Sequence, residues 1–415
     1  MTYKEAQEYL LNSYGAGRKK GLEEMGFALK LLGYPQYDLK IIHVAGTNGK
    51  GSFCAMMGSI LQEAGCKVGA FTSPHIEDVE ERFTINGEKI SKEDFAKTLY
   101  KVVDVSEFIF EDEGDGFSYF EILTLMAFVY FAEKNVDVVL LEVGIGGRLD
   151  ATNVVAEPIL SVIMRIGFDH MEILGNTLEE IAWEKGGIIK ENCPVVLYDD
   201  VDLVYNVFKK IADYRKAEIH HAKDVDLFDF EIGLLGEHQR KNAQVVLTAA
   251  RALVPIFGSR LQISNEVLEN GFANARHPAR MEIMSRDPII ILEGAHNLQG
   301  ASACAENMQV MFAGRDITVV IGIVKDKEIG EIVRVLTSFA GRVIFTRSVD
   351  GFKATDPKEL REIANLGSAE QYDILDCGEA LEKAKEITPK DGVILCTGSL
   401  YLMGDLRKHL HSREA

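Results

Sequence analysis

Short apolar runs alternate with longer stretches of helical periodicity along most of the chain. Ile41, Ile42 and Val44 predict a buried strand, and the apolar spacing from residue 53 to residue 64 predicts a helix that ends at Gly65. Further strands are expected at residues 67–71, 136–143, 159–165 and 194–198. Strands and helices that alternate in this way build a doubly wound, mainly parallel sheet.

A second series of apolar runs begins closer to the C-terminus. Its strands are expected at residues 288–292, 317–323, 342–346, 372–375 and 392–396. Between the two series, residues 236–284 hold two helical segments and a polar stretch that contains a proline. We therefore predict two α/β domains, a larger one at residues 1–285 and a smaller, Rossmann-like one at residues 286–415.

The segment from His43 to Ser52 reads HVAGTNGKGS and joins the first predicted strand to the first predicted helix. Its glycines let the backbone approach an anion because no Cβ stands in the way, and the helix N-terminus adds N–H donors. Lys50 can neutralise terminal phosphates, while Thr47 or Ser52 can reach Mg²⁺. These features predict a P-loop-type domain that binds a nucleotide through its phosphates; the alternative is a glycine-rich turn with a surface lysine.

The loop departs from the usual G-x-x-x-x-G-K-[ST] pattern. Val44 occupies the position of the first glycine, and Gly51 separates Lys50 from Ser52. A strict pattern search would therefore miss it.

Composition narrows the choice of ligands and of compartment. The 415 residues carry a formal net charge of −19, which argues against a general nucleic-acid or anionic-membrane surface. The six cysteines are scattered without a C-x-x-C pair, so we expect reduced thiols in the core. The N-terminal segment lacks the apolar core of a signal peptide and no apolar run is long enough to span a bilayer, so we expect a cytoplasmic protein.

Two candidate side chains follow predicted strands at the sheet edge where α/β proteins bind ligands. Glu142 ends the strand at 136–143 and is placed to hold Mg²⁺ against a phosphate. His170 follows the strand at 159–165, and its pattern leaves a metal, phosphate or structural role open.

Three other segments have simpler interpretations. Residues 144–147 match a dinucleotide-binding fingerprint weakly, because no helix is expected to open after them. The acidic cluster at residues 111–116 is expected to be a solvated loop, since its spacing fails the EF-hand pattern. Thr177 and Glu180 form a capping box for a helix on which Lys185 is, by pattern alone, exposed or paired with Glu184.

Several blocks together resemble the folylpolyglutamate synthase and dihydrofolate synthase family of the Mur ligase superfamily. In chain order they are residues 43–52, 72–75, 81–87, 141–153, 169–170, 184–188, 236–239, 242–243, 292–297, 326–327 and 398–402. They span nearly the whole chain and are specific in combination.

The resemblance implies ATP binding, two Mg²⁺ sites and a carbamylated Lys185. Ser73, Glu142, His170 and Lys185 would bind metal, and Lys50, Glu142, His170 and Lys185 would be catalytic. The implied nucleotide contacts are Gly46, Thr47, Asn48, Gly49, Lys50, Gly51, Ser52, Asn242, Arg280 and Glu293. The pterin-bearing substrate and the incoming glutamate would lie near Ser118, Tyr119, Phe120, Glu121, Leu149, Asp150, Ala151, His296 and Ser399.

Three positions depart from the family pattern. Ala279 stands beside Arg280 where the family carries glycine, and Glu293 stands where it carries aspartate. Gly186 stands where alanine is common. These substitutions concern the nucleotide contacts of Arg280 and Glu293 most directly.

The expected function is an ATP-dependent ligase that adds L-glutamate to the carboxylate of a folate through an acyl phosphate. Dihydropteroate is a second candidate acceptor, and we expect a monomer that binds neither nucleic acid nor membrane. The alternatives are a Mur-type cell-wall ligase, a P-loop kinase or GTPase, and a non-catalytic nucleotide-binding protein. The second α/β domain and the joint presence of Glu142, His170 and Lys185 disfavour the last two. A Mur-type cell-wall ligase would be expected to carry an additional N-terminal domain, whereas the phosphate loop here begins by residue 43.

Overall fold

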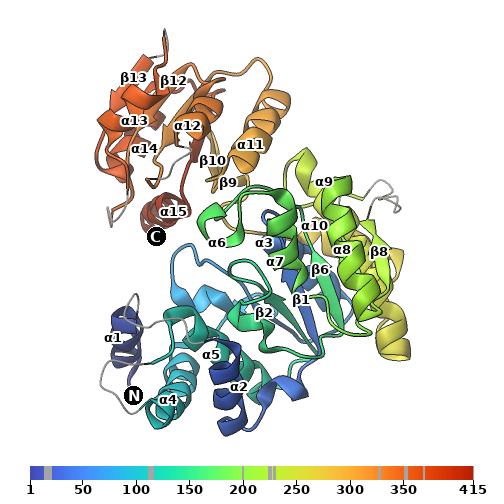
Figure 1. The fold of residues 1–415 in the computed structure, drawn as a ribbon. Helices are drawn as coiled ribbons and strands as arrows, with labels where there is room; N and C mark the ends of the chain where they lie inside the picture. The colour runs from blue at the N-terminus through green and yellow to red at the C-terminus, as the bar shows by residue number, and fades with distance from the viewer. Residues whose placement is uncertain are drawn as a thin grey trace. The chain divides into compact units, whose positions relative to one another are not determined.

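The chain divides into two compact units (Figure 1). The computed structural model describes residues 1–13, 21–110, 116–198, 201–222, 227, 230–325, 329–349, 354–367 and 370–414. Unit 1 comprises residues 1–75, 79–233 and 240–275, and unit 2 comprises residues 76–78, 234–239 and 276–415. Residues 111–115 of the acidic cluster and the motif residues 326–327 lie outside the described residues.

Unit 1 is built on an eight-stranded, mostly parallel sheet. The strands are β1 (Ile41–Ala45), β2 (Val68–Phe71), β3 (Phe83–Ile85), β4 (Glu88–Lys89), β5 (Val138–Glu142), β6 (Leu160–Ile163), β7 (Val195–Leu197) and β8 (Ile219–His221). Their order is β4-β3-β2-β5-β1-β6-β7-β8, with β3 and β4 antiparallel to their neighbours. The central strand β1 lies between β5 and β6, so the segment that follows it begins beside the ends of both.

Helices cover this sheet. They are α1 (Tyr3–Ser13), α2 (Leu22–Leu31), α3 (Lys50–Glu63), α4 (Lys92–Ile109), α5 (Tyr119–Glu133), α6 (Met171–Leu174), α7 (Leu178–Gly186), α8 (Asp202–Arg215), α9 (Glu237–Phe257) and α10 (Asn265–Asn274). Short 3₁₀ turns lie at Pro35–Asp38, Val79–Arg82, Ala151–Val154 and Gly258–Arg260. Helix α5 is buried continuously from Glu121 to Phe131, which explains why its sequence is apolar almost all round.

Unit 2 has its own sheet and its own core. The strands are β9 (Glu282–Arg286), β10 (Ile289–Glu293), β11 (Ile317–Ile321), β12 (Arg342–Phe345), β13 (Glu370–Asp373) and β14 (Val393–Thr397), in the order β13-β12-β11-β14-β10-β9. The helices are α11 (Leu298–Met311), α12 (Ile329–Thr337), α13 (Pro357–Ala364), α14 (Cys377–Ile387) and α15 (Leu400–Glu414). Strand β9 crosses the predicted boundary at 285/286 because it pairs antiparallel with β10, and unit 2 takes it in.

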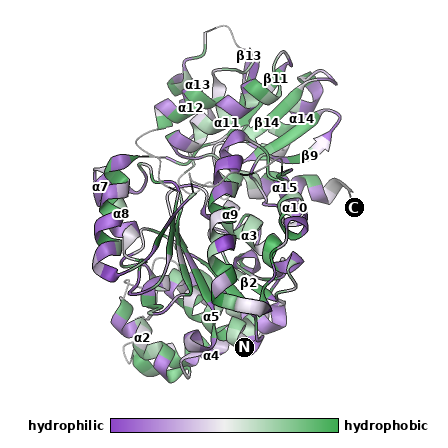
Figure 2. Ribbon diagram, turned by 90° about the vertical axis from the view of Figure 1, so that its right-hand side faces the viewer, coloured by the Kyte–Doolittle hydropathy of each residue, from purple (hydrophilic) through white to green (hydrophobic). Residues whose placement is uncertain are grey.

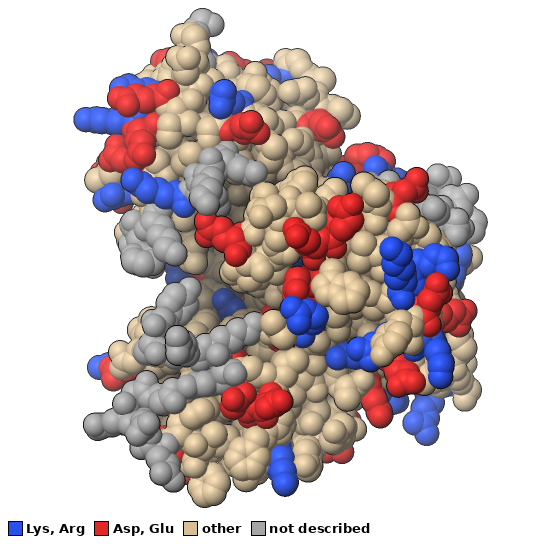
Figure 3. Space-filling view, viewed as in Figure 1, with Lys and Arg blue, Asp and Glu red and all other residues tan. Residues whose placement is uncertain are grey.

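The predicted α/β architecture is confirmed, and each predicted strand coincides with an observed one to within a few residues. In the hydropathy colouring of Figure 2, apolar strands stand out against helices that mix polar and apolar positions. Acidic and basic side chains are interspersed among the described residues on the face shown in Figure 3. In the described part of the chain, every helix is too short or too polar to cross a lipid bilayer.

Candidate active site

Two glycines shape the loop between β1 and α3. Gly49 precedes α3 with φ 92°, and a Cβ on it would lie 2.7 Å from the Asn242 Oδ1 atom. A Cβ on Gly46, whose φ is 148°, would lie 2.6 Å from the Met164 Cβ atom. Only glycine fits at both positions of the loop. Because the loop turns tightly there, Asn242 of α9 packs against it.

The polar groups of this loop are held in place from within and from the neighbouring strand. Lys50 Nζ donates to the carbonyls of Gly46 at 2.9 Å and Thr47 at 3.2 Å. Thr47 Oγ1 donates to the Gly167 carbonyl at 3.0 Å and accepts from the Gly167 N–H at 3.1 Å. Because Gly167 follows β6, the loop is anchored to the next strand end. The lysine, the hydroxyl and the N-terminus of α3 lie together, as a phosphate site requires.

One pair of the expected metal ligands is brought together. The Ser73 backbone N–H donates to Glu142 Oε2 at 3.1 Å, and Glu142, which ends β5, is only 4% exposed. His170 is exposed in a left-handed conformation, with Nε2 3.8 Å from Asp169 Oδ1. Within the described part of the chain, no three His, Cys, Asp or Glu side chains gather closely enough to bind a metal unaided. A metal beside Glu142 would thus also need other oxygen donors.

Lys185 is buried, with 4% of its surface exposed, and its Nζ donates to the Gly46 carbonyl at 3.1 Å. Burial, reinforced by the charge of Lys50, lowers the pKa of Lys185 to about 7, against the opposing effect of Asp169 and Asp150. The pattern-based interpretation of an exposed lysine or a partner of Glu184 is therefore wrong. Glu184 instead accepts from Arg148 Nη2 at 2.8 Å. The lysine amine points to the phosphate loop because α7 packs against the loop that follows β5.

That packing explains the glycines that resemble a dinucleotide fingerprint. A Cβ on Gly147 would lie 2.8 Å from the Glu184 carbonyl oxygen, and a Cβ on Gly187 would lie 2.3 Å from the Arg148 Cα. Asn153 Nδ2 donates to the carbonyls of Arg148 at 2.9 Å and Gly187 at 3.2 Å, which joins the two segments. Sequence reasoning did not single out Asn153 or Arg148. The paired glycines in both segments were the available signal of close backbone contact.

A series of buried hydrogen bonds supports the loop that follows β5. His43 Nε2 lies 2.8 Å from Thr152 Oγ1, which donates to Asp150 Oδ1 at 2.5 Å. Asp150 also accepts from the N–H groups of Ile145 and Thr152. Burial lowers the pKa of His43 to about 3, so the imidazole is neutral and donates through Nε2. Asp150, assigned by resemblance to substrate binding, thus holds the loop's shape.

The substrate candidates at the start of α5 have structural contacts of their own. Ser118 and Glu121 form a capping box, in which Glu121 Oε2 accepts from the Ser118 N–H at 2.8 Å. Phe120 lies so close to Gly144 that a Cβ there would be 2.6 Å from its ring, and the Tyr119 ring lies 5.6 Å from the Arg82 guanidinium. The Phe120 ring therefore borders the loop that follows β5, whereas the Tyr119 ring lies beside the 3₁₀ turn at Val79–Arg82. Of the remaining unit 1 candidates, Leu149 is half-exposed and Ala151 is buried.

In unit 2, Arg280 sits in a strained turn. Its neighbours Ala279 and Met281 both have positive φ, at 54° and 48°. Glu293 Oε2 accepts from the Met281 N–H at 2.8 Å, and its other oxygen lies 3.7 Å from Arg280 Nη1. Burial raises the pKa of Glu293 against the opposing effect of Arg280. The glutamate that replaces the family aspartate therefore ties down the turn that carries Arg280.

The other two candidates in unit 2 lie at helix starts. His296 is exposed, and its Nδ1 lies 2.8 Å from the Gly294 carbonyl oxygen, just before α11. Ser399 is buried and its hydroxyl accepts from the Tyr401 N–H at 3.2 Å, at the start of α15. Both follow strand ends of the unit 2 sheet, β10 and β14, which are neighbours.

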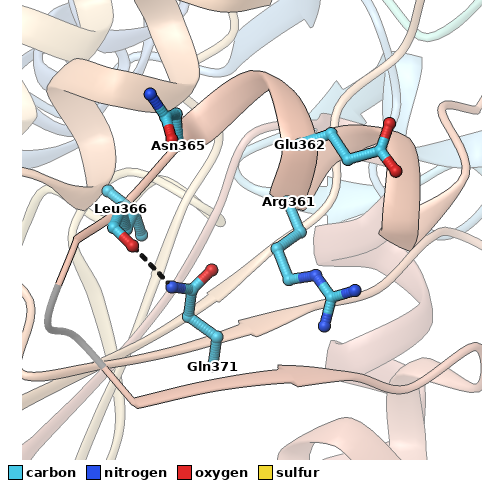
Figure 4. Close-up of a pocket in the computed structure, with 5 residues that line it drawn as sticks. All are labelled: Arg361, Glu362, Asn365, Leu366 and Gln371. Atoms are coloured by element: carbon cyan, nitrogen blue, oxygen red, sulfur yellow. Dashed lines mark hydrogen bonds between the residues drawn. The ribbon is translucent and has the colours of Figure 1, made fainter.

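A separate pocket in unit 2 contains none of the candidate residues. It is lined by Arg361, Glu362, Asn365, Leu366 and Gln371, between α13 and β13 (Figure 4). Gln371 Nε2 donates to the Leu366 carbonyl at 2.7 Å across it. Nothing in its lining resembles a phosphate or metal site.

Family models match both units. Residues 44–250 match the middle domain of Mur ligases, and residues 279–400 match the Mur ligase glutamate ligase domain. These ranges include the phosphate loop, Lys185, Arg280 and Glu293.

Curated relatives match almost end to end. A dihydrofolate synthase/folylpolyglutamate synthase of Bacillus subtilis is 37% identical over 98% of this chain and 99% of its own. A probable dihydrofolate synthetase of Schizosaccharomyces pombe is 34% identical over 94% of this chain and 98% of its own.

Solved structures agree with these relatives. E. coli FolC in complex with DHPP and ADP superimposes with a TM-score of 0.87 at 26% identity, over 100% of this chain and 99% of that one. A bifunctional folylpolyglutamate synthase/dihydrofolate synthase of Yersinia pestis with AMPPNP and a Mn ion has a TM-score of 0.87 at 25% identity, over 99% and 98%. The chain belongs to the folylpolyglutamate synthase/dihydrofolate synthase family of Mur ligases.

Proposed function

We propose that this chain joins L-glutamate to the carboxylate of a folate at the expense of ATP, which becomes ADP and phosphate. The observation that carries the proposal is the convergence of Lys50, Lys185 and the glycine loop beside Glu142 at the ends of β1 and β5. Membership of a family whose characterised members bear this activity in their names supports it. We also propose that the chain acts as a monomer.

The phosphate loop supplies the nucleotide end of the site. Its two glycines let the loop turn tightly against Met164 and Asn242, and the α3 N-terminus and Lys50 supply positive charge. We assign the polyphosphate to residues 46–52 and Asn242, and further nucleotide contact to Arg280. Glu293 acts on the nucleotide indirectly in this proposal, since its carboxylate holds the Arg280 turn.

Glu142 and Ser73 fit a hard divalent cation. Their oxygen donors suit Mg²⁺, which prefers carboxylate, hydroxyl, water and phosphate oxygens. His170 and Lys185 complete the proposed donor set. When bound, the cation supplies charge to neutralise the phosphoryl oxygens.

We further propose that Lys185 is carbamylated. Carbamylation of an amine requires its neutral form, and the carbamate turns a cation into an oxygen donor. The Lys185 amine lies against a backbone carbonyl, and burial, reinforced by the charge of Lys50, lowers its pKa to about 7. A neutral amine is therefore well populated near neutral pH.

The proposed reaction has two steps. A carboxylate oxygen of the folate attacks the γ-phosphorus of ATP, and the bond from that phosphorus to ADP breaks. The amine of glutamate then attacks the carbonyl carbon of the acyl phosphate, loses a proton and displaces phosphate. Lys50 and the loop N–H groups stabilise the charge on the transferred phosphoryl group, which is where protein catalysis of such transfers concentrates.

The test is an incorporation assay with purified full-length chain, ATP, Mg²⁺ and radiolabelled glutamate. Tetrahydrofolate and dihydropteroate are offered in separate reactions, since relatives bear both activities in their names. We expect label in at least one product, with one ADP formed per glutamate. Label in neither product would refute the folate assignment.

A further inference from the structure

A three-residue segment leaves unit 1 and joins unit 2. Residues 76–78 belong to unit 2, whereas residues up to His75 and from Val79 onward belong to unit 1. Ile76 packs into the apolar cluster under α15, and a Cβ on Gly404 of α15 would lie only 2.0 Å from the Ile76 carbonyl oxygen. The segment is therefore docked tightly, with helix α15 open to it only because residue 404 is glycine.

The docked segment follows directly on one of the candidate metal ligands. Ser73, whose N–H binds Glu142, lies three residues before Ile76. Three extended residues span at most about 11 Å, so Ser73 lies within that distance of the docked segment along the chain.

Arg407 of α15 holds this segment by charge. Its Nη1 pairs with the Glu77 carboxylate, and Lys408 Nζ donates to the Glu77 carbonyl at 2.9 Å. The Arg407 and Glu77 side chains are only 20% and 12% exposed, so solvent screens this pair less than an ordinary surface pair.

The same guanidinium reaches the turn that carries Arg280. Arg407 Nη2 donates to Glu282 Oε1 at 3.0 Å, and Nε lies 3.2 Å from both oxygens of that carboxylate. Glu282 Oε2 in turn accepts from the Ala279 N–H at 2.9 Å. A continuous set of charged hydrogen bonds thus runs from Glu77 through Arg407 and Glu282 to the strained turn at residues 279–281.

We propose that Arg407 is a positioning residue that sets the Arg280 turn and the segment following Ser73 in one fixed arrangement. It touches neither candidate site directly and acts through Glu282 and Glu77. A planar guanidinium suits this role because its donors are fixed in one plane and bind two carboxylates from separate edges, whereas an ammonium group has no fixed donor directions. The proposal rests on the proposed function, in which Ser73 and Arg280 contact metal and nucleotide.

The test compares binding of MgADP by calorimetry in the wild-type chain, Arg407→Ala, Arg407→Lys and Glu77→Gln. We expect the dissociation constant to rise about tenfold or more in Arg407→Ala. Loss of a residue that orients ligand-binding groups typically has an effect of this size. The dissociation constants of Arg407→Lys and Glu77→Gln should lie between those of the wild type and Arg407→Ala. In turnover assays, the KM for MgATP should rise by more than kcat falls.

The matched control is Arg342→Ala. Arg342 also bridges two carboxylates, Asp316 at 2.7 Å and Glu370 at 3.3 Å, with a similar 23% exposure, but at the starts of β12 and β13. It should lower thermal stability about as much and leave the MgADP dissociation constant within twofold.

The outcomes distinguish the positioning role of Arg407 from the proposed function on which it rests. Unchanged MgADP affinity in folded Arg407→Ala, or in Glu77→Gln where the alanine variant does not fold, would overturn the positioning role alone. An equal loss of affinity in Arg342→Ala would also overturn it, since the effect would then be general destabilisation. Failure of the wild-type chain to bind MgADP would overturn the proposed function as well.

Discussion

At the residue scale, the environment of Lys185 changes the chemistry open to it. A lysine in water is almost fully charged at neutral pH, whereas burial beside Lys50 leaves Lys185 with a pKa of about 7. The sequence predicts only a helix lysine, because burial depends on α7 meeting the loop after β5. The resemblance assigned a role that the residue pattern alone could not.

Replacement of Lys185 tests that role. We expect Lys185→Ala to lower kcat by about a hundredfold or more, since it removes a group aimed at the phosphate loop. Lys190→Ala is the control, because Lys190 is also largely buried with a pKa lowered to about 8, yet its amine binds the Asn153 carbonyl. Steady-state assays should show Lys190→Ala within a few-fold of wild type, and equal losses in both variants would contradict the assignment.

His43 makes stability depend on pH in a defined direction. Its pKa is about 3 in the folded chain and about 6.5 when unfolded, so the unfolded state binds the extra proton below pH 6.5. Folding should therefore lose about 2 kcal/mol from this group between pH 7 and pH 5. Urea unfolding of wild type and His43→Asn at both pH values measures it. The variant should lose less stability on acidification, and an identical loss would show that His43 is not buried neutral.

The Arg280 turn contains an alanine in a left-handed conformation. Ala279→Gly should leave stability within about 0.5 kcal/mol of wild type, because relief of the left-handed strain is offset by the entropy cost of glycine and by the loss of a fully buried methyl group. Ala305→Gly, in the helical backbone of α11, should lower stability by about 1 kcal/mol. Thermal unfolding compares the two variants, and an equal loss of stability in both would contradict the backbone account.

At the element scale, the site depends on how closely α7 and the loop after β5 approach. The sequence predicts both elements, since β5 is an apolar run and α7 begins with a capping box. It does not predict their contact, which rests on backbone hydrogen bonds such as Arg148 N–H to the Glu184 carbonyl at 2.7 Å. The edge strands β8 and β9 were also missed, because both are only half-buried and so lack an apolar run.

Gly187→Ala tests this contact. The added Cβ would lie 2.3 Å from the Arg148 Cα, so the loop must shift and both stability and kcat should fall, the latter about tenfold or more. The control is Gly26→Ala in α2, where nothing lies within 4 Å of the added Cβ. That change should stabilise the chain by about 0.5–1 kcal/mol and leave kcat unchanged. Full activity in Gly187→Ala would contradict the packing account.

At the scale of the whole molecule, two α/β units carry the candidate residues, and the chain passes between them more than once. The sequence predicts the two sheets, because their apolar runs are local. The sequence does not predict the contacts of Arg407, because the Arg407–Glu77 pair joins positions more than three hundred residues apart. Long-range ion pairs leave no periodic pattern in the sequence, so this supporting contact is visible only in the folded chain.

The central claim is that the site activates a carboxylate by phosphorylation. The most direct measurement supplies tetrahydrofolate labelled with ¹⁸O in its carboxylates, together with ATP, Mg²⁺ and glutamate, and analyses the released phosphate by mass spectrometry. The account predicts one ¹⁸O atom transferred to phosphate for each glutamate added. Formation of the amide with phosphate free of ¹⁸O would contradict it.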